Sequence, residues 1–464
     1  MQIPIEQIEK QLAICDEIRG KSDGAARLAM VDTYGCQQNE ADSEKLRGFL
    51  ARMGYGFTQD ENEADLVAIN TCAVREHAEQ RVLGNIGALT HTKRRNPNQI
   101  IVVCGCMVGQ RHMVEKLRES YRQVDLVFAP SDVWRFPELL LRTMTERGGV
   151  YEYAGADVLA EGLPHLRDGK VKAWLSVMYG CNNFCSYCVV PFVRGRERSR
   201  GIEAVVDEAR GLVADGYKDI TLLGQNVNSY GNDLGTGVNF AELIRRVNEI
   251  PGEFRIRFMT SHPKDATEEL FKTMAQSEKC AKHIHLPFQA GNDRVLREMN
   301  RGYTREGYLA LIEMARRYMP TVVITSDVIV GFPGETDEEF EDTLELVRKA
   351  RFDALFTFIF SKRERTKAAS MPDPFTREEK QVRFDALMEL QNEISGEKHA
   401  AMVGRTERVL VDGVSDGKEY DLTSRTDGNR LVHLQGSEFL VGRFIDAEIT
   451  DSRTWALFGK VKDE

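Results

Sequence analysis

The sequence has no long apolar run, and this absence limits the classes of protein to which it can belong. No stretch reaches the ~20 apolar residues that a bilayer-spanning helix needs. The start, MQIPIEQIEKQLAICDEIRG, is acidic and amphipathic, without the basic flank and apolar core of a signal peptide. We therefore expect a cytoplasmic protein with no membrane partner.

The chain also lacks an excess of positive charge. Its 62 Lys and Arg residues are outnumbered by 72 Asp and Glu residues, which gives a formal net charge of −10. A chain of this charge cannot coat nucleic acid nonspecifically, so any RNA site must be a local basic patch on an acidic body.

A disulfide framework is a further feature that the sequence does not support. The nine cysteines are an odd number that cannot pair completely, and the expected compartment keeps thiols reduced. Reduced thiolates are soft ligands for iron or zinc. Metal binding is therefore the function that these cysteines indicate.

What the sequence does contain is an alternation of apolar strands and amphipathic helices. At 464 residues the chain is too long for one compact core. After a helical extension at 1–27, residues 28–148 carry β-rich runs such as RLAMVDTY, ADLVAIN and QIIVVCG, each followed by a helical pattern. This order predicts a doubly wound parallel α/β sheet, in which sites gather beyond the carboxyl ends of the strands.

A second alternating series follows a predicted linker at 149–172 and occupies residues 173–398. Its six strand–helix units, with strands such as AWLSVMYG, FRIRFMT and DALFTFIFS, predict an open partial (β/α)6 barrel rather than a closed eightfold one. Residues 399–464 change to short alternating strands such as RVLVDGV and RLVHLQG. They predict a small OB-like β-barrel, a common nucleic-acid-binding shape.

The segment CNNFCSYC places Cys181, Cys185 and Cys188 just after the first predicted barrel strand. Three thiolates on one tight loop can hold three irons of a 4Fe–4S cluster and leave the fourth iron open for a small molecule. The alternative is a zinc knuckle with a distant fourth ligand, although no CxxC or HxxxH partner follows downstream.

This loop resembles that of the radical S-adenosylmethionine (SAM) superfamily. In that superfamily the open iron chelates the amino and carboxylate groups of SAM, and electron transfer cleaves the cofactor to a 5′-deoxyadenosyl radical. The resemblance implies that Cys181, Cys185 and Cys188 are the catalytic cluster ligands and that Tyr187 lies beside the adenine of the cofactor.

Three further cysteines lie just past predicted strands of the N-terminal domain: Cys36, Cys72 and Cys106. Parallel strands bring such ends together, so the three thiolates can converge on a second cluster. The alternative is that they are buried free thiols. Cys104 lies two residues before Cys106 in the CGC motif, where both would point to the same strand face, and the pattern does not choose between them. Cys15 and Cys280 stand in unclustered helical contexts, which indicates core or surface thiols.

Long motifs then resemble the methylthiotransferases. TYGCQQNEADSE, INTCAVREHAEQR and VVCGCMVGQ are similar to their N-terminal domain, and the resemblance selects Cys36, Cys72 and Cys106 as ligands of an auxiliary cluster. YGCNNFCSYCVVPFVRGRERSR and TSDVIVGFPGET are similar to one branch, the tRNA-2-methylthio-N(6)-dimethylallyladenosine synthases. GRTERVLV and LTSRTDGNRLVHL resemble their TRAM domain.

Two segments depart from the family pattern. The loop that usually reads S-x-R-x-G-T-x-A is SKRERTKAA here, with Arg365 in place of glycine, and a Gln-Ser-Gly-Ser element appears as QAGN at 289–292. By resemblance both border the substrate cavity, so substrate preference is where this chain can differ.

The resemblance also implies the residues that contact the cofactor, namely Gln225, Asn226, Gln289 and the turn that begins at Gly331. A glycine-rich turn at a strand end lets backbone approach a ligand closely. Asp327, His283 and His285 fit the interpretation of satisfied, hydrogen-bonded strand residues at least as well as a role in the site.

Arginines suggest where RNA would bind. RGRERSR places Arg194, Arg196, Arg198 and Arg200 directly after the cluster loop, where alternation would present several of them to phosphates. A solvated surface is the alternative for such a run. In the slightly acidic TRAM-like segment, RNA binding would depend on Arg425 and Arg430.

The resemblance implies methylthiolation of carbon 2 of N(6)-dimethylallyladenosine at position 37 of tRNA. SAM would be both radical source and methyl donor, and sulfur would pass through the auxiliary cluster, so the cofactors are two 4Fe–4S clusters and SAM. The implied partners are a tRNA anticodon stem-loop, a reductant such as flavodoxin or ferredoxin, and a sulfur-donor protein. Threonylcarbamoyladenosine in tRNA, a ribosomal-protein aspartate, or a zinc-stabilised RNA-binding protein without catalysis remain as alternatives.

Overall fold

The computed structural model describes residues 2–21, 26–73, 76–146, 148–153, 157–417 and 419–462. The chain divides into two compact units. The first comprises Met1–Asp168, Met178–Asn182 and Cys188–Arg200, and the second comprises Gly169–Val177, Asn183–Tyr187 and Gly201–Glu464. Within the described ranges, no helix combines the length and apolar character that a membrane span requires.

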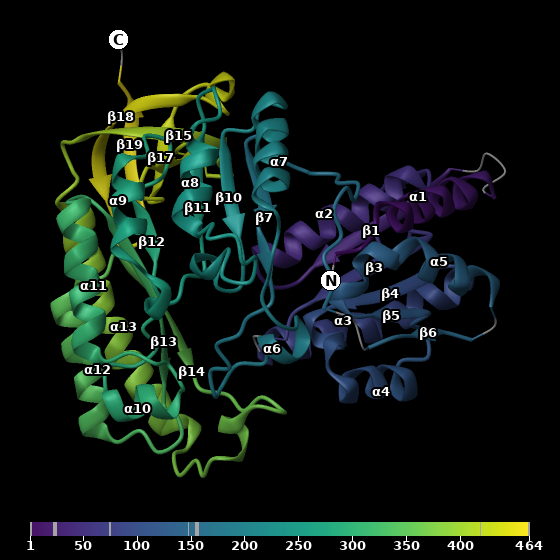
Figure 1. Ribbon diagram of the computed structural model, residues 1–464, viewed down its shortest axis with the longest axis horizontal. Coiled ribbons are helices and arrows are strands. Elements are labelled where there is room, and N and C mark those ends of the chain that lie inside the picture. The colour runs from purple at the N-terminus through teal and green to yellow at the C-terminus, as the bar shows by residue number, and fades with distance from the viewer. Residues whose placement is uncertain are drawn as a thin grey trace. The chain divides into compact units, whose positions relative to one another are not determined.

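The first unit contains a parallel sheet (Figure 1) with the strand order β2-β1-β3-β4-β5-β6 among its described residues. The strands are β1 (Arg27–Thr33), β2 (Tyr55–Phe57), β3 (Leu66–Thr71), β4 (Ile100–Gly105), β5 (Leu126–Phe128) and β6 (Val150–Tyr151). The helices are α1 (Ile5–Gly20), α2 (Gln37–Arg52), α3 (Glu76–Arg95), η1 (Cys106–Gly109), α4 (Arg111–Ser120), η2 (Pro130–Arg135), α5 (Phe136–Thr145) and α6 (Val190–Val193).

Alternation along the strands produces two hydrophobic cores, one on each face of this sheet. Val102 and Cys104 of β4 pack with residues of α1, α2 and α5, whereas Ile101 and Val103 pack with residues of α3 and α4. Because successive strand residues point to opposite faces, helices cover both sides. The predicted doubly wound sheet is confirmed.

Two details of the first unit differ from the sequence-based expectation. The short strand β2 was not predicted, and β6 lies inside the range expected to be a linker, so the sheet continues two residues beyond 149.

The expected first barrel strand ends early, at Ser176. Met178 and Tyr179 form a separate strand, β8 (Met178–Tyr179), which pairs antiparallel with β9 (Arg198–Ser199).

The second unit contains the six predicted barrel strands in two parallel sheets, ordered β11-β10-β7 and β12-β13-β14 among the described residues. A single parallel bridge between Ile256 and Cys280 links β11 to the segment before β12. The strands are β7 (Lys172–Ser176), β10 (Asp219–Leu223), β11 (Arg255–Phe258), β12 (His283–His285), β13 (Val323–Val330) and β14 (Ala354–Ile359).

Helices follow the barrel strands as a (β/α)6 series requires. Thr336 caps the helix after β13, since its side chain accepts from Glu339 N–H and the Glu339 side chain accepts from Thr336 N–H, a capping box. The helices are α7 (Ile202–Ala214), η3 (Val227–Ser229), α8 (Phe240–Asn248), η4 (Pro263–Asp265), α9 (Glu268–Gln276), α10 (Asp293–Glu298), α11 (Arg305–Tyr318), α12 (Asp337–Ala350), η5 (Lys367–Ser370) and α13 (Arg377–Ala400).

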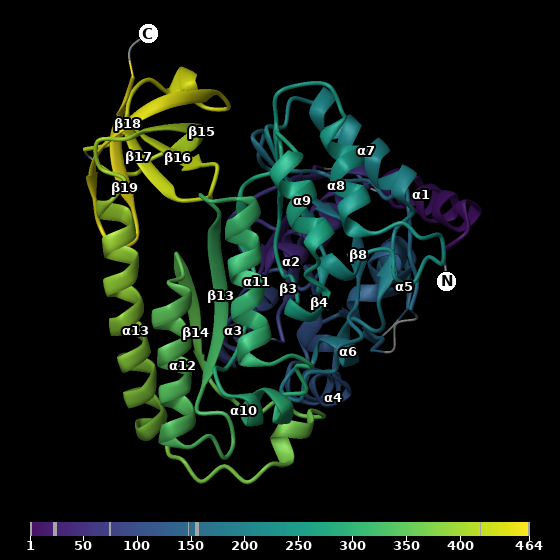
Figure 2. The same cartoon turned by 60° about the vertical axis from the view of Figure 1, so that its left-hand side comes forward.

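The long helix α13 leads into a closed C-terminal barrel, drawn in yellow in Figure 2, with the order β15-β16-β17-β19-β18. This confirms the OB-like barrel. Its elements are β15 (Thr406–Val414), β16 (Leu422–Thr426), β17 (Leu431–Gln435), η6 (Glu438–Leu440), β18 (Phe444–Ser452) and β19 (Leu457–Val461).

Two buried arginines of β11 attach this small barrel to the (β/α)6 part of the same unit. Arg255 donates to the carbonyls of Arg425 and Thr426, at 3.2 and 3.1 Å. Arg257 donates to the carbonyls of Thr426 and Asp427, at 3.0 and 2.9 Å, and to the Asp219 carboxylate at 2.8 Å. Main-chain carbonyls therefore accept four of the hydrogen bonds of this attachment, beside side-chain ion pairs such as Lys172–Asp412 and Arg430–Asp353.

Candidate functional site

The first unit brings Cys36, Cys72 and Cys106 to the carboxyl end of its sheet. Cys36 is the N-cap of α2, three residues after β1; Cys72 directly follows β3; and Cys106 directly follows β4. Because β1, β3 and β4 are neighbours in the sheet, their ends are adjacent. The placement expected from the sequence is confirmed; their role as ligands stays a prediction.

Asn39, in the first turn of α2, connects two of these thiols. Its Oδ1 lies 3.6 Å from Cys36 Sγ and 3.9 Å from Cys106 Sγ, while its Nδ2 donates to the carbonyl of Thr71 at 2.8 Å. Asn39 therefore holds together the chain segments that carry all three cysteines.

Two glycines allow these loops to approach one another. A Cβ on Gly35 would lie 2.9 Å from Cys72 Cβ and 3.2 Å from its Sγ, and one on Gly105 would lie 2.4 Å from Asn70 Oδ1 and from the Thr71 carbonyl. Both glycines also have positive φ, +129° and +95°, a conformation that side-chain-bearing residues rarely adopt.

The three thiols influence one another electrostatically. Burial raises the pKa of the Cys106 thiol to about 12; Arg194 acts in the opposite direction, and Cys72 and Cys36 raise it further. A metal centre would reverse this tendency, because a coordinated thiol is deprotonated. Together the three supply soft sulfur donors.

These donors fit a cluster better than a single ion. Among the described residues, no three His, Cys, Asp or Glu side chains are arranged to hold one metal ion. In an iron–sulfur cluster each cysteine binds its own iron, so the thiolates need not converge on one point. The all-sulfur donor set therefore fits a 4Fe–4S cluster.

Cys104 belongs to a different environment. It lies on β4 in the apolar core shared with α1, α2 and α5, whereas Cys106 packs with Ala73, Val189 and Val193. The expectation that Cys104 and Cys106 share a strand face is wrong, because β4 ends at Gly105 and its two-residue alternation stops there. Cys15 and Cys280 are also buried.

The CNNFCSYC loop carries three half-buried thiols within eight residues. Cys181 and Cys188 belong to the first unit, where Cys188 Sγ accepts from Val190 N–H at 3.5 Å. Cys185 belongs to the second unit, where its Sγ accepts from Arg301 Nη1 at 3.3 Å. Such spacing on one loop leaves little freedom in how far apart the sulfurs can lie.

Asn300, which follows α10, positions the middle of this loop. Its Nδ2 donates to the carbonyls of Asn183 and Phe184, at 3.1 and 3.0 Å. Phe184 has a φ of +47°, an unfavourable backbone conformation for a bulky residue. These hydrogen bonds help to hold the loop in it.

The second unit also contains buried polar atoms with no hydrogen-bond partner within the described part of the chain, among them Ser186 Oγ, Asn226 Oδ1, Ser261 Oγ and His262 Nε2. Ser186 lies in the cysteine loop, and the other three follow β10 or β11. An unsatisfied buried polar atom costs about 1–3 kcal/mol. The presence of several such atoms near strand ends fits a bound polar cofactor such as SAM.

His262 was not anticipated from the sequence. Its Nδ1 accepts from Lys264 N–H at 3.2 Å, so Nε2 carries the proton of the neutral ring. Burial, with Arg301 and Lys264 nearby, lowers the pKa of His262 to about 2. Its position in SHP, just past a strand, was the signal that could have drawn attention to it and to Ser261.

The predicted cofactor contacts have mixed environments. Asn226 is buried and donates to Asp265 Oδ2 at 2.8 Å. Gln289 is buried with a φ of +69° and forms a bridge with Val328. Tyr187 packs against the buried cluster around Phe332, and Gln225 is half-buried after β10. None of these placements by itself assigns a ligand.

Gly331 serves packing within the protein. Its φ is +68°, and a Cβ there would lie 2.4 Å from Lys380 Cγ. Its N–H donates to Glu335 Oε2 at 2.8 Å, and burial raises the pKa of Glu335 to about 7. Helix α13 therefore approaches Gly331 closely, and the contact of Gly331 with the cofactor stays a prediction.

The histidines of β12 are satisfied, as expected. His283 Nε2 and His285 Nδ1 each lie 3.0 Å from Thr325 Oγ1, and His285 Nε2 lies 3.4 Å from Asp327 Oδ1. These contacts confirm the interpretation as hydrogen-bonded strand residues.

Two members of the arginine run pair with carboxylates within the protein. Arg194 and Arg198 are buried, and they form ion pairs with Asp42 at 3.0 Å and Asp157 at 2.8 Å. Because these side chains are buried and paired with carboxylates, they would have to exchange those partners to meet RNA phosphates, and that role stays a prediction. Arg196 is exposed.

The two TRAM arginines also pair with carboxylates. Arg425 Nε lies 3.5 Å from Asp412 Oδ2, and Arg430 forms an ion pair with Asp353. Both are half-buried. Their use in RNA binding stays a prediction and would require them to exchange these partners.

The structure gives a physical account of both departures from the family pattern. Arg365, where glycine is usual, has a φ of +67°, so the backbone keeps a conformation that favours glycine. Asn292, where serine is usual, caps α10 by accepting from Arg294 and Val295 N–H. Serine and asparagine are both good caps.

Three family models match parts of this chain. They match at 175–347 (radical SAM superfamily), 28–129 (uncharacterized protein family UPF0004) and 400–462 (TRAM domain). Among solved structures, the fold is similar to a radical SAM methyltransferase, TsrM, from Kitasatospora setae. The TM-score is 0.55 at 16% identity, over 74% of this chain and 77% of that one. The cobalamin-dependent SAM radical enzyme OxsB gives 0.51 at 14% identity, over 81% and 56%.

Sequence relatives are much closer. A protein of a Thermoanaerobacter species is 47% identical over 98% of this chain and 97% of its own length. One from Acetivibrio thermocellus is 47% identical over 98% and 96%. Both are named tRNA-2-methylthio-N(6)-dimethylallyladenosine synthase. With this likeness along nearly its full length, the chain belongs to the tRNA-2-methylthio-N(6)-dimethylallyladenosine synthase family of radical SAM enzymes.

Proposed function

We propose that this protein methylthiolates carbon 2 of N(6)-dimethylallyladenosine at position 37 of tRNA. SAM serves as both radical source and methyl donor, and sulfur is delivered through an auxiliary cluster. The observation that carries the proposal is the 47% identity to synthases of this name over almost the whole chain. The two cysteine sites support it, because this chemistry needs both.

Each cysteine set has its own task in the proposal. Cys181, Cys185 and Cys188 bind the radical-generating cluster, and Cys36, Cys72 and Cys106 bind the auxiliary cluster. When bound, the clusters and SAM supply the radical, the methyl group and the sulfur.

The chain's own groups bind and orient the cofactor. Ser186 Oγ and His262 Nε2–H are available donors for its carboxylate or hydroxyl groups, and Asn226 Oδ1 is an available acceptor for its amino group. All three side chains are buried, so they also limit the access of water. Tyr187, Gln225, Gln289 and Gly331 are proposed to complete this pocket.

The proposed partners are a tRNA anticodon stem-loop bound in part by the C-terminal barrel, a flavodoxin- or ferredoxin-like reductant, and a sulfur-donor protein. The cytoplasm is the proposed location. The proposed domain boundaries are 1–27, 28–148, 149–172, 173–398 and 399–464, and strand β6 lies within the linker range although it belongs to the sheet.

Burial of the dimethylallyl group would provide substrate preference. It adds five carbons, and each buried CH₂ contributes about 0.8 kcal/mol, so the total is a few kcal/mol. A threonylcarbamoyl group would instead need a cation for its carboxylate. Arg363 and Arg365 in the departing loop are the residues that could provide one.

The experiment is direct competition between two anticodon stem-loops, one with dimethylallyladenosine and one with threonylcarbamoyladenosine. We expect faster methylthiolation of the first, read by nucleoside mass spectrometry. Faster reaction of the second would overturn the substrate assignment and keep the enzyme class. Zinc in place of about eight irons per chain in anaerobically purified protein would overturn the enzyme class itself.

A further inference from the structure

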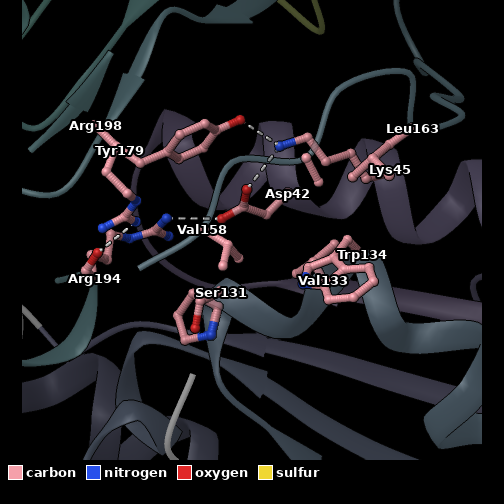
Figure 3. A pocket seen from close by; sticks show the side chains of 12 residues that line it. Asp42, Lys45, Ser131, Val133, Trp134, Val158, Leu163, Tyr179, Arg194 and Arg198 are labelled. Atoms are coloured by element: carbon pink, nitrogen blue, oxygen red, sulfur yellow. Dashed lines mark hydrogen bonds and ion pairs between the residues drawn. The ribbon is translucent and has the colours of Figure 1, made fainter. Parts of the chain in front are cut away.

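A buried chain of polar contacts leads to Cys106 in the first unit. Tyr179 Oη lies 3.0 Å from Lys45 Nζ, Lys45 Nζ lies 3.3 Å from Asp42 Oδ1, and Asp42 Oδ2 lies 3.0 Å from Arg194 Nη1 (Figure 3). Arg194 Nε then donates to Cys106 Sγ at 3.0 Å. The guanidinium group therefore connects a charged network with one proposed ligand of the auxiliary cluster.

This network carries an uncompensated positive charge. Lys45 and Arg194 share one carboxylate, Asp42, and all three are buried. The neighbouring Arg198 and Arg200 have their own partners, Asp157 and Glu161. The cavity that Asp42, Lys45 and Arg194 help to line has a volume of about 50 Å³, room for only a few water molecules. A buried charge without a partner is costly, so an anionic neighbour is expected.

The sulfur side of Arg194 can supply that anion. Arg194 contacts Cys106 Sγ and also Asn39 Oδ1, at 3.1 Å, and Asn39 itself lies beside Cys36 Sγ. A 4Fe–4S core of charge +2 bound by three thiolates has a net charge of about −1. Together with the surplus of +1 on the network, the site becomes neutral.

We propose that Arg194 is a positioning residue for the auxiliary cluster, which donates to Cys106 and raises the reduction potential of that cluster. This inference depends on the proposed function, since it takes Cys36, Cys72 and Cys106 as ligands. One-electron reduction makes the cluster more negative, and a fixed cation with an N–H···S hydrogen bond stabilises the more negative state. Arginine keeps its proton throughout, so the electron enters without proton transfer at this residue.

The fold holds the guanidinium group in place. Arg194 directly follows α6, and Val193 of that helix packs with Cys106 and Ala73. A Cβ on Gly109 of η1 would lie 2.9 Å from Val193 Cβ, so this contact is already close. Asp42 fixes the opposite edge of the guanidinium group. The hydrogen bond to Cys106 therefore does not depend on a mobile side chain.

The test isolates the auxiliary cluster in the full-length protein by replacing Cys181, Cys185 and Cys188 with Ala. Redox titration followed by electron paramagnetic resonance then gives the potential of the remaining cluster. We expect Arg194→Gln to lower the reduction equilibrium constant at least tenfold, which is 59 mV for a one-electron couple. Asp42→Asn should raise the potential, because it removes the charge that opposes Arg194.

Arg196→Gln is the matched control, since Arg196 is exposed on the same segment and should leave the potential unchanged. A merely structural role would not give shifts of opposite sign at Arg194 and Asp42. An unchanged potential in both variants overturns the inference and leaves the proposed function intact. If the Arg194→Gln protein takes up no cluster, the potential of Asp42→Asn decides the test. A raised potential supports the inference, and an unchanged or lowered potential overturns it. Absence of any cluster in the Ala background overturns both the ligand assignment and the inference.

Discussion

The two cysteine sites are built in different ways. The N-terminal site draws Cys36, Cys72 and Cys106 from the ends of three sheet strands, so it exists only when the sheet is formed. The CNNFCSYC site takes its three cysteines from eight consecutive residues, so their proximity is set largely by the chain itself. One site therefore depends on tertiary structure, and the other mainly on local sequence.

Each site nevertheless has one buried arginine directed at one sulfur. Arg194 donates to Cys106 and shares the Asp42 carboxylate with Lys45. Arg301 donates to Cys185, and its further hydrogen bonds are to neutral groups, the Pro287 carbonyl and the Tyr303 hydroxyl. The comparison shows the same contact with different compensation.

The largest expected effect comes from removing the CNNFCSYC site. Replacing Cys181, Cys185 and Cys188 together by Ala should abolish 5′-deoxyadenosine formation, because no iron is left to bind and reduce SAM. About half of the iron should remain, since one of two 4Fe–4S clusters persists. Chromatography of the nucleoside product and iron analysis measure these outcomes. Normal cleavage by this variant would sink the assignment.

Removing the N-terminal site should separate SAM cleavage from methylthiolation. Replacing Cys36, Cys72 and Cys106 should leave SAM cleavage measurable but eliminate methylthio product, because the proposed sulfur source is lost. The control is Cys104→Ala, which removes a buried core thiol and should keep both cluster and product. Loss of the auxiliary cluster in Cys104→Ala would show that the other thiol of the CGC pair is the ligand.

A glycine substitution can test the dependence on tertiary structure without touching a cysteine. Gly105→Ala places a Cβ 2.4 Å from Asn70 and Thr71 at a φ of +95°. We expect about 2 kcal/mol or more of destabilisation in the first unit and loss of its cluster only, as measured by denaturant unfolding and iron content. Gly148→Ala has a similar φ, +101°, but open space around it. It should cost only about 1–2 kcal/mol and keep both clusters, so equal cluster loss in the two variants would contradict the explanation.

The smallest effect is the dependence of stability on pH, which differs in sign between the two units. In the second unit, burial together with Arg257 lowers the pKa of His283 to about 3. The unfolded chain then takes up a proton below about pH 6.5 that the folded chain does not, so stability falls as pH drops. At pH 5.5 the loss is about 1.4 kcal/mol.

The first unit should respond to acid in the opposite direction. Burial raises the pKa of Glu44 to about 7 and of Asp132 to about 6, so stability from these groups rises as pH falls from 7. Hydrogen exchange at pH 7.5 and 5.5 can follow each unit. Glu335 of the second unit acts like Glu44, so His283→Gln is needed to isolate the histidine. If the stability of the second unit changes with pH in His283→Gln as it does in the unsubstituted protein, the prediction is contradicted.

Much of the fold followed from the sequence because its strands are apolar and flanked by helical patterns. The parallel order also predicted that Cys36, Cys72 and Cys106 would gather at one edge, without any knowledge of side-chain contacts. The strands β2 and β6 were missed because three and two residues are too short for a periodic signal.

The main difference between the expected and the observed side-chain environments concerns buried charge. Helix α2 buries Asp42, Glu44, Lys45 and Arg47, although such residues normally indicate a solvent-facing surface. Arg194 looked like a phosphate contact because its partners, Asn39 and Asp42, lie more than a hundred residues away in the sequence. Pairing over such distances leaves no local pattern. His262 and Ser261 were missed because an isolated polar residue after a strand is usually part of an ordinary loop.

The attachment of the C-terminal barrel has a consequence for how this enzyme can change during evolution. Arg255 and Arg257 bind the carbonyls of residues 425–427, and among those residues only Asp427 adds a side-chain contact to β11. Main-chain carbonyls are the same whatever side chain the residue carries. Substitutions at residues 425 and 426 can therefore accumulate without loss of these hydrogen bonds, whereas the ion pairs Lys172–Asp412 and Arg430–Asp353 tie other parts of the joint to particular side chains.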